Sequence, residues 1–282
     1  MEYILENSSL KLTFDSLGGE LRSIINKNNG NKEYLWQGNP DIWAGQSPIL
    51  FPIVGRLIDD KYYLDGKEYT MPKHGLARKL LFSVKECEGA KAVFSLESDE
   101  NTLGSYPFDF ELLITFELIG KSLRNTMKVI NKTKGEMYFS IGAHPGFNCA
   151  VGDVIEFEMP ETLATERIDS DNLIIDKKFP LLENSREIEI TEDIFKADAL
   201  ILSDIKSEKL RIKGENEIEF TFGKCPFLGI WAKPGAPYVC IEPWYGVNDG
   251  REVKADISEK RGIERLAEGE TFEFFWNAEI IK

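Results

Sequence analysis

Residues that build metal and disulfide sites are scarce in this chain of 282 residues. It has only 2 histidines, so a three-histidine metal site is impossible, and no HExxH or DxDxDG motif is present. The cysteines are far apart and form no CxxC pair: Cys87, Cys149, Cys225 and Cys240. This spacing disfavours a zinc ribbon or a disulfide framework, and it favours a reduced, cytoplasmic protein.

Long apolar runs and an excess of positive charge are also missing. The longest apolar run, around Pro48–Val54, is far shorter than the ~20 residues that a membrane-spanning helix needs. The first residues, MEYILENSSL, have no basic start followed by an apolar stretch, so we expect no secretory signal. Acidic residues outnumber basic ones by 48 to 34, and the net charge is −14. A nucleic-acid backbone or an anionic membrane would repel such a chain, so we expect neither as a partner.

Alternation of apolar and polar residues is the dominant pattern that is present. The clearest case is 108–118, where every second residue is Phe, Leu or Ile. A turn at 119–122 and a second alternating stretch from Leu123 to Val129 complete a predicted hairpin. Helical periodicity is limited to 194–200 and 257–266, where we expect at most a turn or two of helix. These stretches are too short to connect parallel strands, so the strands should be antiparallel.

The composition supports one large core. Hydrophobic residues make up 42% of the chain, and no linker or repeat divides it. No GxGxxG or P-loop motif opens a helix, which disfavours nucleotide-binding folds. We therefore predict an all-β protein in which residues 1–282 form a single domain, a large antiparallel β-sandwich.

Four segments interrupt the alternation and are candidates for chemistry. The first, 43–56, is apolar, rich in proline and glycine, and ends at Arg56. The second, 73–78, places His74 before a glycine and ends at Arg78. On pattern alone, the first segment could be a buried loop capped by a surface arginine, and the second could be an ordinary turn.

The third segment, 137–148, has a face of small and polar residues. Strand parity places Ser140, Gly142 and His144 together on that face. Small residues would leave room for a ligand above the strand, next to the histidine. The alternative is a histidine at the end of an ordinary solvated strand.

The fourth segment, 227–246, reads as two strands joined by a turn. Parity directs Tyr238, Cys240 and Glu242 outward, together with Trp231 of the preceding strand. A carboxylate beside exposed aromatic rings is typical of a sugar site, because rings stack on C–H faces and carboxylates accept hydrogen bonds from hydroxyls. We therefore assign Trp231 as a stacking platform; the alternative is a surface glutamate at a sheet edge.

Histidine and glutamate are well suited to acid–base catalysis near neutral pH. No GxSxG motif is present, and no cysteine lies beside a histidine in the sequence. The residues therefore favour proton transfer over covalent catalysis.

The same segments carry a resemblance to a known family. Over nearly its whole length the chain resembles the aldose 1-epimerase (galactose mutarotase-like) family, and within it the LacX-like branch. The similarity rests on the sequence PILFPIVGR that ends at Arg56, on His74-Gly75, on AHPGFN around His144 and on IEPW around Glu242. The resemblance implies a galactose mutarotase-like supersandwich, which is a large antiparallel β-sandwich.

The resemblance also implies roles for individual residues. His144 matches the histidine that donates a proton to the ring oxygen of the sugar. Glu242 matches the glutamate that removes a proton from the anomeric hydroxyl. Arg56 and His74 match substrate-binding residues, and Asp198 matches an aspartate that holds sugar hydroxyls.

The implied activity is that of an aldose 1-epimerase, or mutarotase, which interconverts the α and β anomers of an aldohexose by ring opening and reclosure. It needs no metal and no redox cofactor. Its partner is a small-molecule sugar, and the protein would be a monomer or a homodimer. His144 would have to hold a proton at neutral pH, so we expect a nearby carboxylate to support its charge.

Three alternatives stay open. A hexose-6-phosphate 1-epimerase would need basic residues at the site, for which Lys73, Arg78 and Lys233 are candidates. A catalytically silent carbohydrate-binding protein would need no acid–base pair, so the presence of both His144 and Glu242 disfavours it. An interaction protein on a generic β-sandwich would bind no sugar at all.

Overall fold

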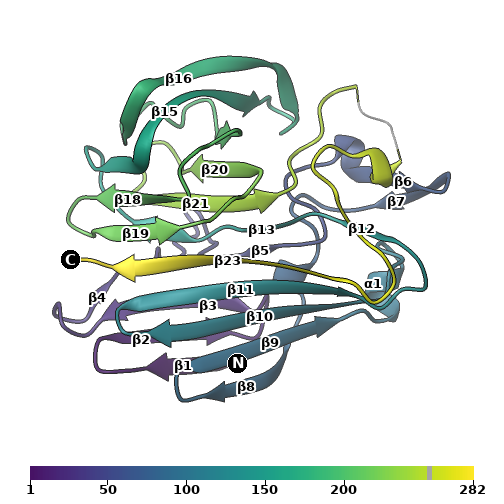
Figure 1. The fold of residues 1–282 in the computed structure, drawn as a ribbon, viewed down its shortest axis with the longest axis horizontal. Helices are drawn as coiled ribbons and strands as arrows, with labels where there is room; N and C mark the ends of the chain where they lie inside the picture. The colour runs from purple at the N-terminus through teal and green to yellow at the C-terminus, as the bar shows by residue number, and fades with distance from the viewer. Residues whose placement is uncertain (253–255) are drawn as a thin grey trace.

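The fold consists almost entirely of antiparallel β-strands (Figure 1). The computed structural model describes residues 1–252 and 256–282. One sheet of 4 strands contains β1 (Glu2–Glu6), β2 (Leu10–Asp15), β3 (Glu20–Asn26) and β4 (Lys32–Glu33). A sheet of 15 strands has the order β5 (Ile49–Leu50), β13 (Ile141–Ala143), β21 (Tyr238–Tyr245), β20 (Phe227–Trp231), β17 (Leu200–Leu202), β15 (Val154–Ile168), β18 (Lys209–Lys213), β19 (Ile218–Thr221), β23 (Thr271–Ile280), β11 (Ser122–Asn131), β10 (Phe110–Ile119), β9 (Lys91–Glu97) and β8 (Ser83–Glu88). In the same sheet, β14 (Gly146–Asn148) pairs with β21, and β16 (Ile174–Glu189) pairs with β15.

The remaining elements are short. Two further pairs of strands are the hairpin of β6 (Lys61–Leu64) with β7 (Lys67–Thr70), and the long-range pair of β12 (Met137–Phe139) with β22 (Glu264–Leu266). The helical elements of the described residues are α1 (Glu100–Leu103) and the 3₁₀ turns η1 (Ile58–Asp60), η2 (Ala77–Lys79) and η3 (Ile257–Glu259). Within the described residues, no helix combines the length and the apolar character required to cross a membrane.

The predicted all-β class is confirmed, and so is the hairpin at 108–129. Strands β10 and β11 pair through ten residues each, closed by Ile119 opposite Ser122. Gly120 in the turn has a φ of 60°, a left-handed conformation that glycine adopts without steric cost. The two helical expectations are met only by the single turn η3. Residues 192–198 form a succession of turns that leads into β17.

The two large sheets pack face to face around aromatic residues. The ring of Phe14 on β2 lies 6.0 Å from that of Phe94 on β9 and 4.5 Å from that of Phe116 on β10. In Figure 1, β1 to β3 lie beside β8 to β11, as these contacts require. This packing is that of the predicted antiparallel sandwich.

Strand β21, which carries Glu242, lies inside the protein. It pairs with β13 and β14 along one edge and with β20 along the other, and only its last residue is not buried. The expectation that Tyr238, Cys240 and Glu242 face outward is therefore wrong. Alternation assumes one solvated face, whereas here the rings of Trp36 and Trp43 stack on Tyr238 and cover the second face.

Candidate active site

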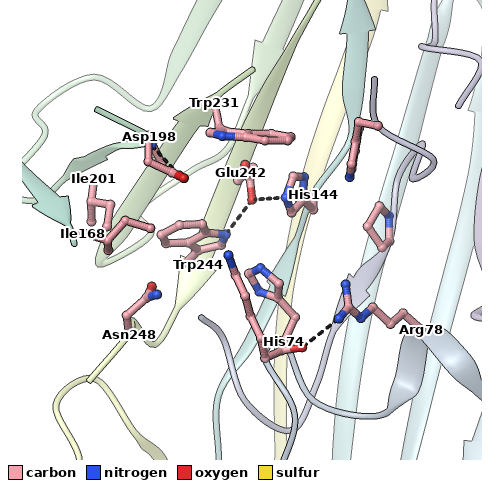
Figure 2. A pocket seen from close by; sticks show the side chains of 14 residues that line it. His74, Arg78, His144, Ile168, Asp198, Ile201, Trp231, Glu242, Trp244 and Asn248 are labelled. Carbon is pink, nitrogen blue, oxygen red and sulfur yellow. Dashed lines mark hydrogen bonds and ion pairs between the residues drawn. The ribbon is translucent and has the colours of Figure 1, made fainter. Parts of the chain in front are cut away.

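A cavity of about 240 Å³ opens over the end of the large sheet that contains β21 (Figure 2). Five of the six residues predicted for the site line it: His74, His144, Asp198, Trp231 and Glu242. They come from positions up to 168 residues apart, from 74 to 242, so the fold brings together segments that are distant in the sequence. A concave, partly apolar cavity with several converging polar groups is the usual form of a small-molecule site.

His144 and Glu242 are in direct contact at the bottom of this cavity. His144 follows the short strand β13, and Glu242 lies on the adjacent β21. Nε2 of His144 is 3.2 Å from Oε2 of Glu242. Glu242 is 1% exposed and His144 is 8% exposed, so the pair is almost completely withdrawn from solvent.

Burial shifts the pKa values of the two residues in opposite directions. It lowers the pKa of His144 to about 3, and the positive charges of Lys73 and Arg78 act in the same direction. Burial raises the pKa of Glu242 well above its usual value, while a hydrogen bond from Trp244 and the charge of Lys73 oppose the rise. Both shifts favour the uncharged forms, a carboxylic acid and a neutral imidazole. A carboxylate was expected next to His144 to support its charge. The group found there is the carboxyl group of Glu242, the predicted base.

The indole ring of Trp244 forms the floor beside Glu242. A Cβ atom on Gly142 would lie 2.7 Å from Cδ1 of Trp244, and one on Gly229 would lie 2.6 Å from its Cζ2. The ring thus occupies the space above both glycines. The small residues of 140–144 were expected to leave room for a ligand. The space next to Gly142 is instead occupied by the indole ring of Trp244, and this ring in turn lines the cavity.

Aromatic rings form one wall of the cavity. Trp43 stacks on His144 with ring centroids 5.0 Å apart and planes 26° from parallel. Trp231 meets both Trp43 and His144 edge-on, at 5.5 and 5.8 Å. Trp231 is only half-buried, so its ring surface is available to the cavity.

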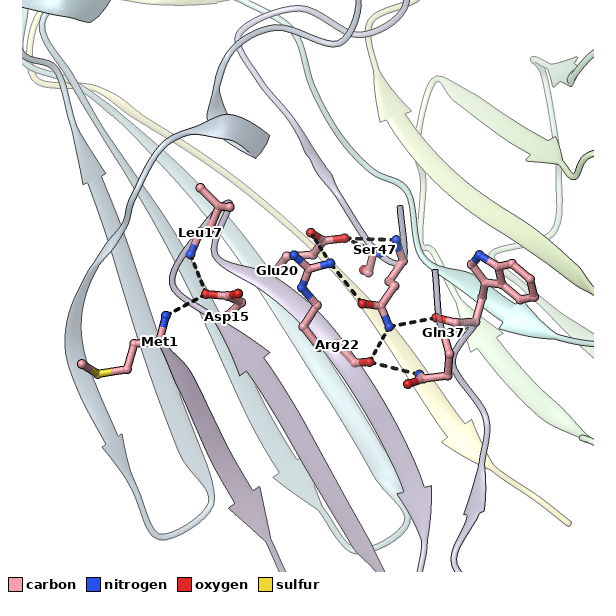
Figure 3. Close-up of polar contacts among 9 residues, drawn as sticks. Met1, Asp15, Leu17, Glu20, Arg22, Gln37 and Ser47 are labelled. Atoms are coloured by element: carbon pink, nitrogen blue, oxygen red, sulfur yellow. Dashed lines mark hydrogen bonds and ion pairs between the residues drawn. The ribbon is translucent and has the colours of Figure 1, made fainter. Parts of the chain in front are cut away.

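A network of hydrogen bonds holds the segment that carries Trp43 (Figure 3). The buried carboxylate of Glu20 accepts hydrogen bonds from the backbone N–H groups of Gln46 and Ser47, at 3.1 and 2.9 Å. The side chain of Gln46 donates to the carbonyl groups of Arg22 and Trp36. This irregular segment is thereby tied to strand β3 rather than to solvent.

His74 projects from a loop that is joined to the segment ending at Arg56. Its backbone N–H donates to the carbonyl of Gly55, and its Nδ1 accepts from the N–H of Gly55 at 3.2 Å. Burial lowers the pKa of His74 well below its usual value, so the ring is neutral. Because Nδ1 accepts, the ring proton is on Nε2, and His74 can serve as a fixed hydrogen-bond donor.

Asp198 lies on the opposite wall, in the turn before β17. Its backbone φ is 63°, and its Oδ1 accepts from the N–H of Ala199 at 2.7 Å. The guanidinium of Arg167 donates to the carbonyl groups of Asp198, Ala199 and Ile194. The turn is therefore held from below, and the carboxylate borders the cavity.

Arg56 does not line the cavity. Its guanidinium makes two hydrogen bonds to Asp60, with Nε 2.9 Å from Oδ1 and NH2 2.8 Å from Oδ2. Its backbone carbonyl accepts from the N–H of Asp249 and so supports the loop that carries Asn248, which does line the cavity. The structure thus places Arg56 beside the site and not in it.

Two cations border the cavity next to His74. Lys73 and Arg78 are both half-buried, and burial lowers the pKa of each. Lys73 bonds to the side chain of Asn172, and one terminal nitrogen of Arg78 donates to the carbonyl of Lys73 at 2.8 Å. Nε of Arg78 is buried without a partner among the described residues. Lys233, the third basic candidate, is exposed and lies outside the lining.

Sequence reasoning assigned no role to Trp43, Trp244 and Asn248, although all three border the cavity. Trp43 and Trp244 lay inside segments that the sequence singled out, so their position was a usable signal. Asn248 follows β21 in a loop, and no pattern in the sequence distinguishes it.

In the described part of the chain, one group of side chains has the geometry to hold a metal ion. The ligand atoms of His144, Cys240 and Glu242 all lie within 4.8 Å of one another. Burial raises the pKa of the Cys240 thiol well above its usual value, which opposes the thiolate form that binds metals. The donor set therefore fits an acid–base pair better than a metal centre.

Known proteins are similar to this chain in sequence and in fold. The model of the family described as Aldose 1-epimerase matches residues 1–252. The plasmid-encoded protein LacX of Lactococcus lactis is 31% identical over 284 aligned residues, which cover 93% of each chain. The crystal structure of a galactose mutarotase related enzyme from Lactobacillus acidophilus is 31% identical, with a TM-score of 0.93 over 100% of this chain and 98% of that one.

A third similar structure is a galactose mutarotase-like protein from Lactobacillus casei, 26% identical, with a TM-score of 0.94 over the full length of both chains. A shorter match, 29% identical over 161 residues and covering 54% of this chain and 49% of its relative, is the "Putative glucose-6-phosphate 1-epimerase" of Salmonella typhimurium. Family model, relatives and structures agree: the chain belongs to the aldose 1-epimerase family.

Proposed function

We propose that this protein is an aldose 1-epimerase that interconverts the α and β anomers of an aldohexose. The observation that carries the proposal is the 3.2 Å contact between His144 and Glu242 at the bottom of a partly open cavity. The same cavity offers an aromatic surface and a carboxylate suited to sugar hydroxyls, at Trp231 and Asp198.

The reaction needs one acid and one base. Glu242 removes the proton from the hydroxyl on C1, and His144 donates a proton to the ring oxygen. The bond between C1 and the ring oxygen breaks, which gives the open-chain aldehyde. After rotation about the C1–C2 bond, the ring closes on the other face, and each residue reverses its role. Both oxygens are attached to C1, so two side chains in direct contact can reach both at once.

The pair must hold one proton in total, whichever residue carries it at rest. Burial favours the carboxylic acid and the neutral imidazole. A sugar hydroxyl that donates to Glu242 favours the carboxylate, because hydrogen bonds to the charged form stabilise it. The proton then crosses the contact to Nε2 of His144. The two residues titrate as a pair, so a bell-shaped pH profile reports pKa values of the pair.

Two further side chains can hold the sugar in place. The neutral ring of His74 donates through Nε2, and Asp198 accepts from hydroxyl groups on the other wall. Trp231 offers its ring surface to a C–H face of the sugar. His74, Asp198 and Trp231 line the same cavity as His144 and Glu242, so their contacts can fix the position of C1 next to this pair.

A phosphorylated aldohexose is the second candidate substrate. The observation that favours it is the pair of cations, Lys73 and Arg78, on one wall, with Nε of Arg78 unpartnered among the described residues. Guanidinium and ammonium groups are the usual partners of phosphate oxygens. If a phosphosugar is the substrate, Arg78→Gln will lower kcat/KM for glucose 6-phosphate far more than for glucose.

The test is the rate at which anomers exchange. Optical rotation of freshly dissolved α-glucose or α-galactose, and NMR exchange between the anomers of glucose 6-phosphate, follow both classes of substrate. We expect the wild-type protein to accelerate at least one of them. His144→Gln and Glu242→Gln should each slow turnover by about 10²–10⁴-fold, because each removes one proton-transfer partner.

Glu264→Gln is the matched control. Glu264 is half-buried on β22 and lies outside the cavity lining. Its replacement therefore measures the effect on activity of a Glu-to-Gln substitution that does not touch the cavity. Full activity in both His144→Gln and Glu242→Gln would refute the proposed roles. Sugar binding without any acceleration by the wild type would instead identify a catalytically silent binding protein.

A further inference from the structure

Trp244 makes a contact that the reaction scheme above does not use. It lies two residues after Glu242 on β21, so both side chains project from the same face of the strand. The indole Nε1–H donates to Oε2 of Glu242 at 3.2 Å, in a fully buried setting (Figure 2). Oε2 is also the oxygen that contacts His144. Among the described residues, no group donates to the other oxygen, Oε1.

The indole ring cannot turn away from this contact. Gly142 is its cross-strand neighbour on β13, and Gly229 is the cross-strand neighbour of Glu242 on β20. The ring fills the space above both of them, as the short distances from their notional Cβ atoms show. The ring also packs in an apolar cluster that includes Leu50, Val54 and Phe227. The direction of the N–H bond is therefore fixed by the packing.

We propose that Trp244 is a positioning residue for the general base: its N–H anchors Oε2 of Glu242 and leaves Oε1 free to receive the anomeric hydroxyl. The proposal rests on the proposed function, since it assigns the base a geometry. An anchored carboxylate keeps one oxygen toward His144 and presents the other to the sugar. Without this hydrogen bond, the carboxylate could rotate. The pKa of Glu242 would also rise, because the lost hydrogen bond stabilised the charged form.

The first test removes the N–H and keeps an aromatic ring. In Trp244→Phe we expect kcat/KM to fall by roughly 10- to 100-fold, the range for a lost hydrogen bond to a charged group. The pH profile should also move to higher pH, because the pair releases its protons less readily when the anion is less stabilised. A residue that only fills space would lower the activity without moving the profile.

Trp276→Phe is the matched control. Trp276 is 1% exposed on β23, and its Nε1 has no hydrogen-bond partner among the described residues. This variant makes the same chemical change in an equally buried place, outside the cavity. We expect its pH profile to coincide with that of the wild type.

A second test does not depend on turnover. The indole N–H signal of Trp244 in a ¹⁵N NMR spectrum is the one that disappears in Trp244→Phe. We expect that signal to shift in Glu242→Gln and to follow the titration of the pair in the wild type. If the signal shifts neither in Glu242→Gln nor with pH in the wild type, the anchoring contact is refuted, whatever the activity.

The two tests separate the two proposals. An active Trp244→Phe variant with an unmoved pH profile would overturn the role of Trp244 and leave the proposed function intact. A wild-type protein that exchanges no anomers of any sugar tested would overturn the proposed function, and the base-positioning role would fall with it.

Discussion

Two glycines determine where the strand around Glu242 can hold an indole ring. Gly142 and Gly229 lie on the strands that flank β21, and side chains at these positions would occupy the place of Trp244. Both glycines are in extended strands without a positive φ, so conformational freedom is not the reason for their presence. Their role is to lack a side chain.

Gly229→Ala tests this at the scale of one methyl group. Its Cβ would lie 2.6 Å from Cζ2 of Trp244, so the ring must move. We expect a loss of about 1–3 kcal/mol in the free energy of unfolding, the usual cost of overpacking, and a parallel loss of epimerase activity. Gly104→Ala is the control, because the nearest atom there is at an ordinary 3.6 Å. Urea unfolding of both variants measures the difference, and equal stabilities would contradict the prediction.

Site residues could be predicted where the neighbouring sequence marked them. His144 and Glu242 stand out because the sequence around each interrupts an alternating strand, and both line the cavity. Arg56 carried the same kind of signal, yet its guanidinium pairs with Asp60, only four residues away. Trp244 lay in a segment that the sequence singled out, but its role was not predicted, because its contact with Gly142 depends on the pairing of β21 with β13, about 100 residues earlier in the chain.

At the scale of elements, residues 43–48, which precede β5, form no helix or strand and depend on Glu20. Glu20 is the first residue of strand β3 and is 6% exposed. Its carboxylate accepts two hydrogen bonds from the backbone of 46–47 and forms an ion pair with Arg22. The same sheet holds a second carboxylate with similar partners, Asp15, which accepts from the N-terminal amine and from the N–H of Leu17 (Figure 3). The two differ mainly in burial.

Glu20→Gln and Asp15→Asn form a matched pair. Loss of the buried negative charge, which two backbone N–H groups and Arg22 contact, should cost about 1–3 kcal/mol in the free energy of unfolding and should raise KM, because the Trp43 wall loosens. Asp15 is more exposed, so its replacement should cost under about 1 kcal/mol and leave KM unchanged. Chemical denaturation and steady-state kinetics give both quantities. A similar cost in the two variants would show that burial does not control the strength of these contacts.

The period-2 pattern predicted strands well where one face of the sheet is covered and the other is open. Strands β10 and β11 have this alternating burial, and their hairpin was predicted with its turn. The pattern failed on β21, where both faces are covered. The second cover is supplied by Trp36 and Trp43, from a segment about 200 residues earlier in the chain, and no local pattern contains that information.

At the scale of the whole molecule, the large sheet depends on its last strand. The family model matches residues 1–252, yet β23 (Thr271–Ile280) pairs with β11 on one side and with β19 on the other. It therefore joins the half of the sheet that surrounds the cavity to the half that packs on β1 to β4 (Figure 1). The sandwich was predictable in class, but this long-range order of strands was not.

Acid should destabilise the whole protein through its buried histidines. The pKa of His144 is 6.5 in an unfolded chain and about 3 in the fold, where burial disfavours the charge. Between these values the unfolded chain binds a proton that the native site refuses, so the free energy of unfolding falls as the pH falls. In His144→Gln this contribution is absent, and urea unfolding should lose less stability between pH 6.5 and pH 3 than in the wild type. Identical pH dependence in the two proteins would contradict the burial of an uncharged His144.

The contrast between β21 and β16 has a consequence for how freely the sequence can vary. All but one of the residues of β21 are buried, so almost every substitution there meets a packed neighbour. Strand β16, at the rim of the same sheet, exposes most of its side chains to water. Random substitutions should therefore accumulate in β16 at little cost, whereas the strand that carries Glu242 and Trp244 should tolerate almost none.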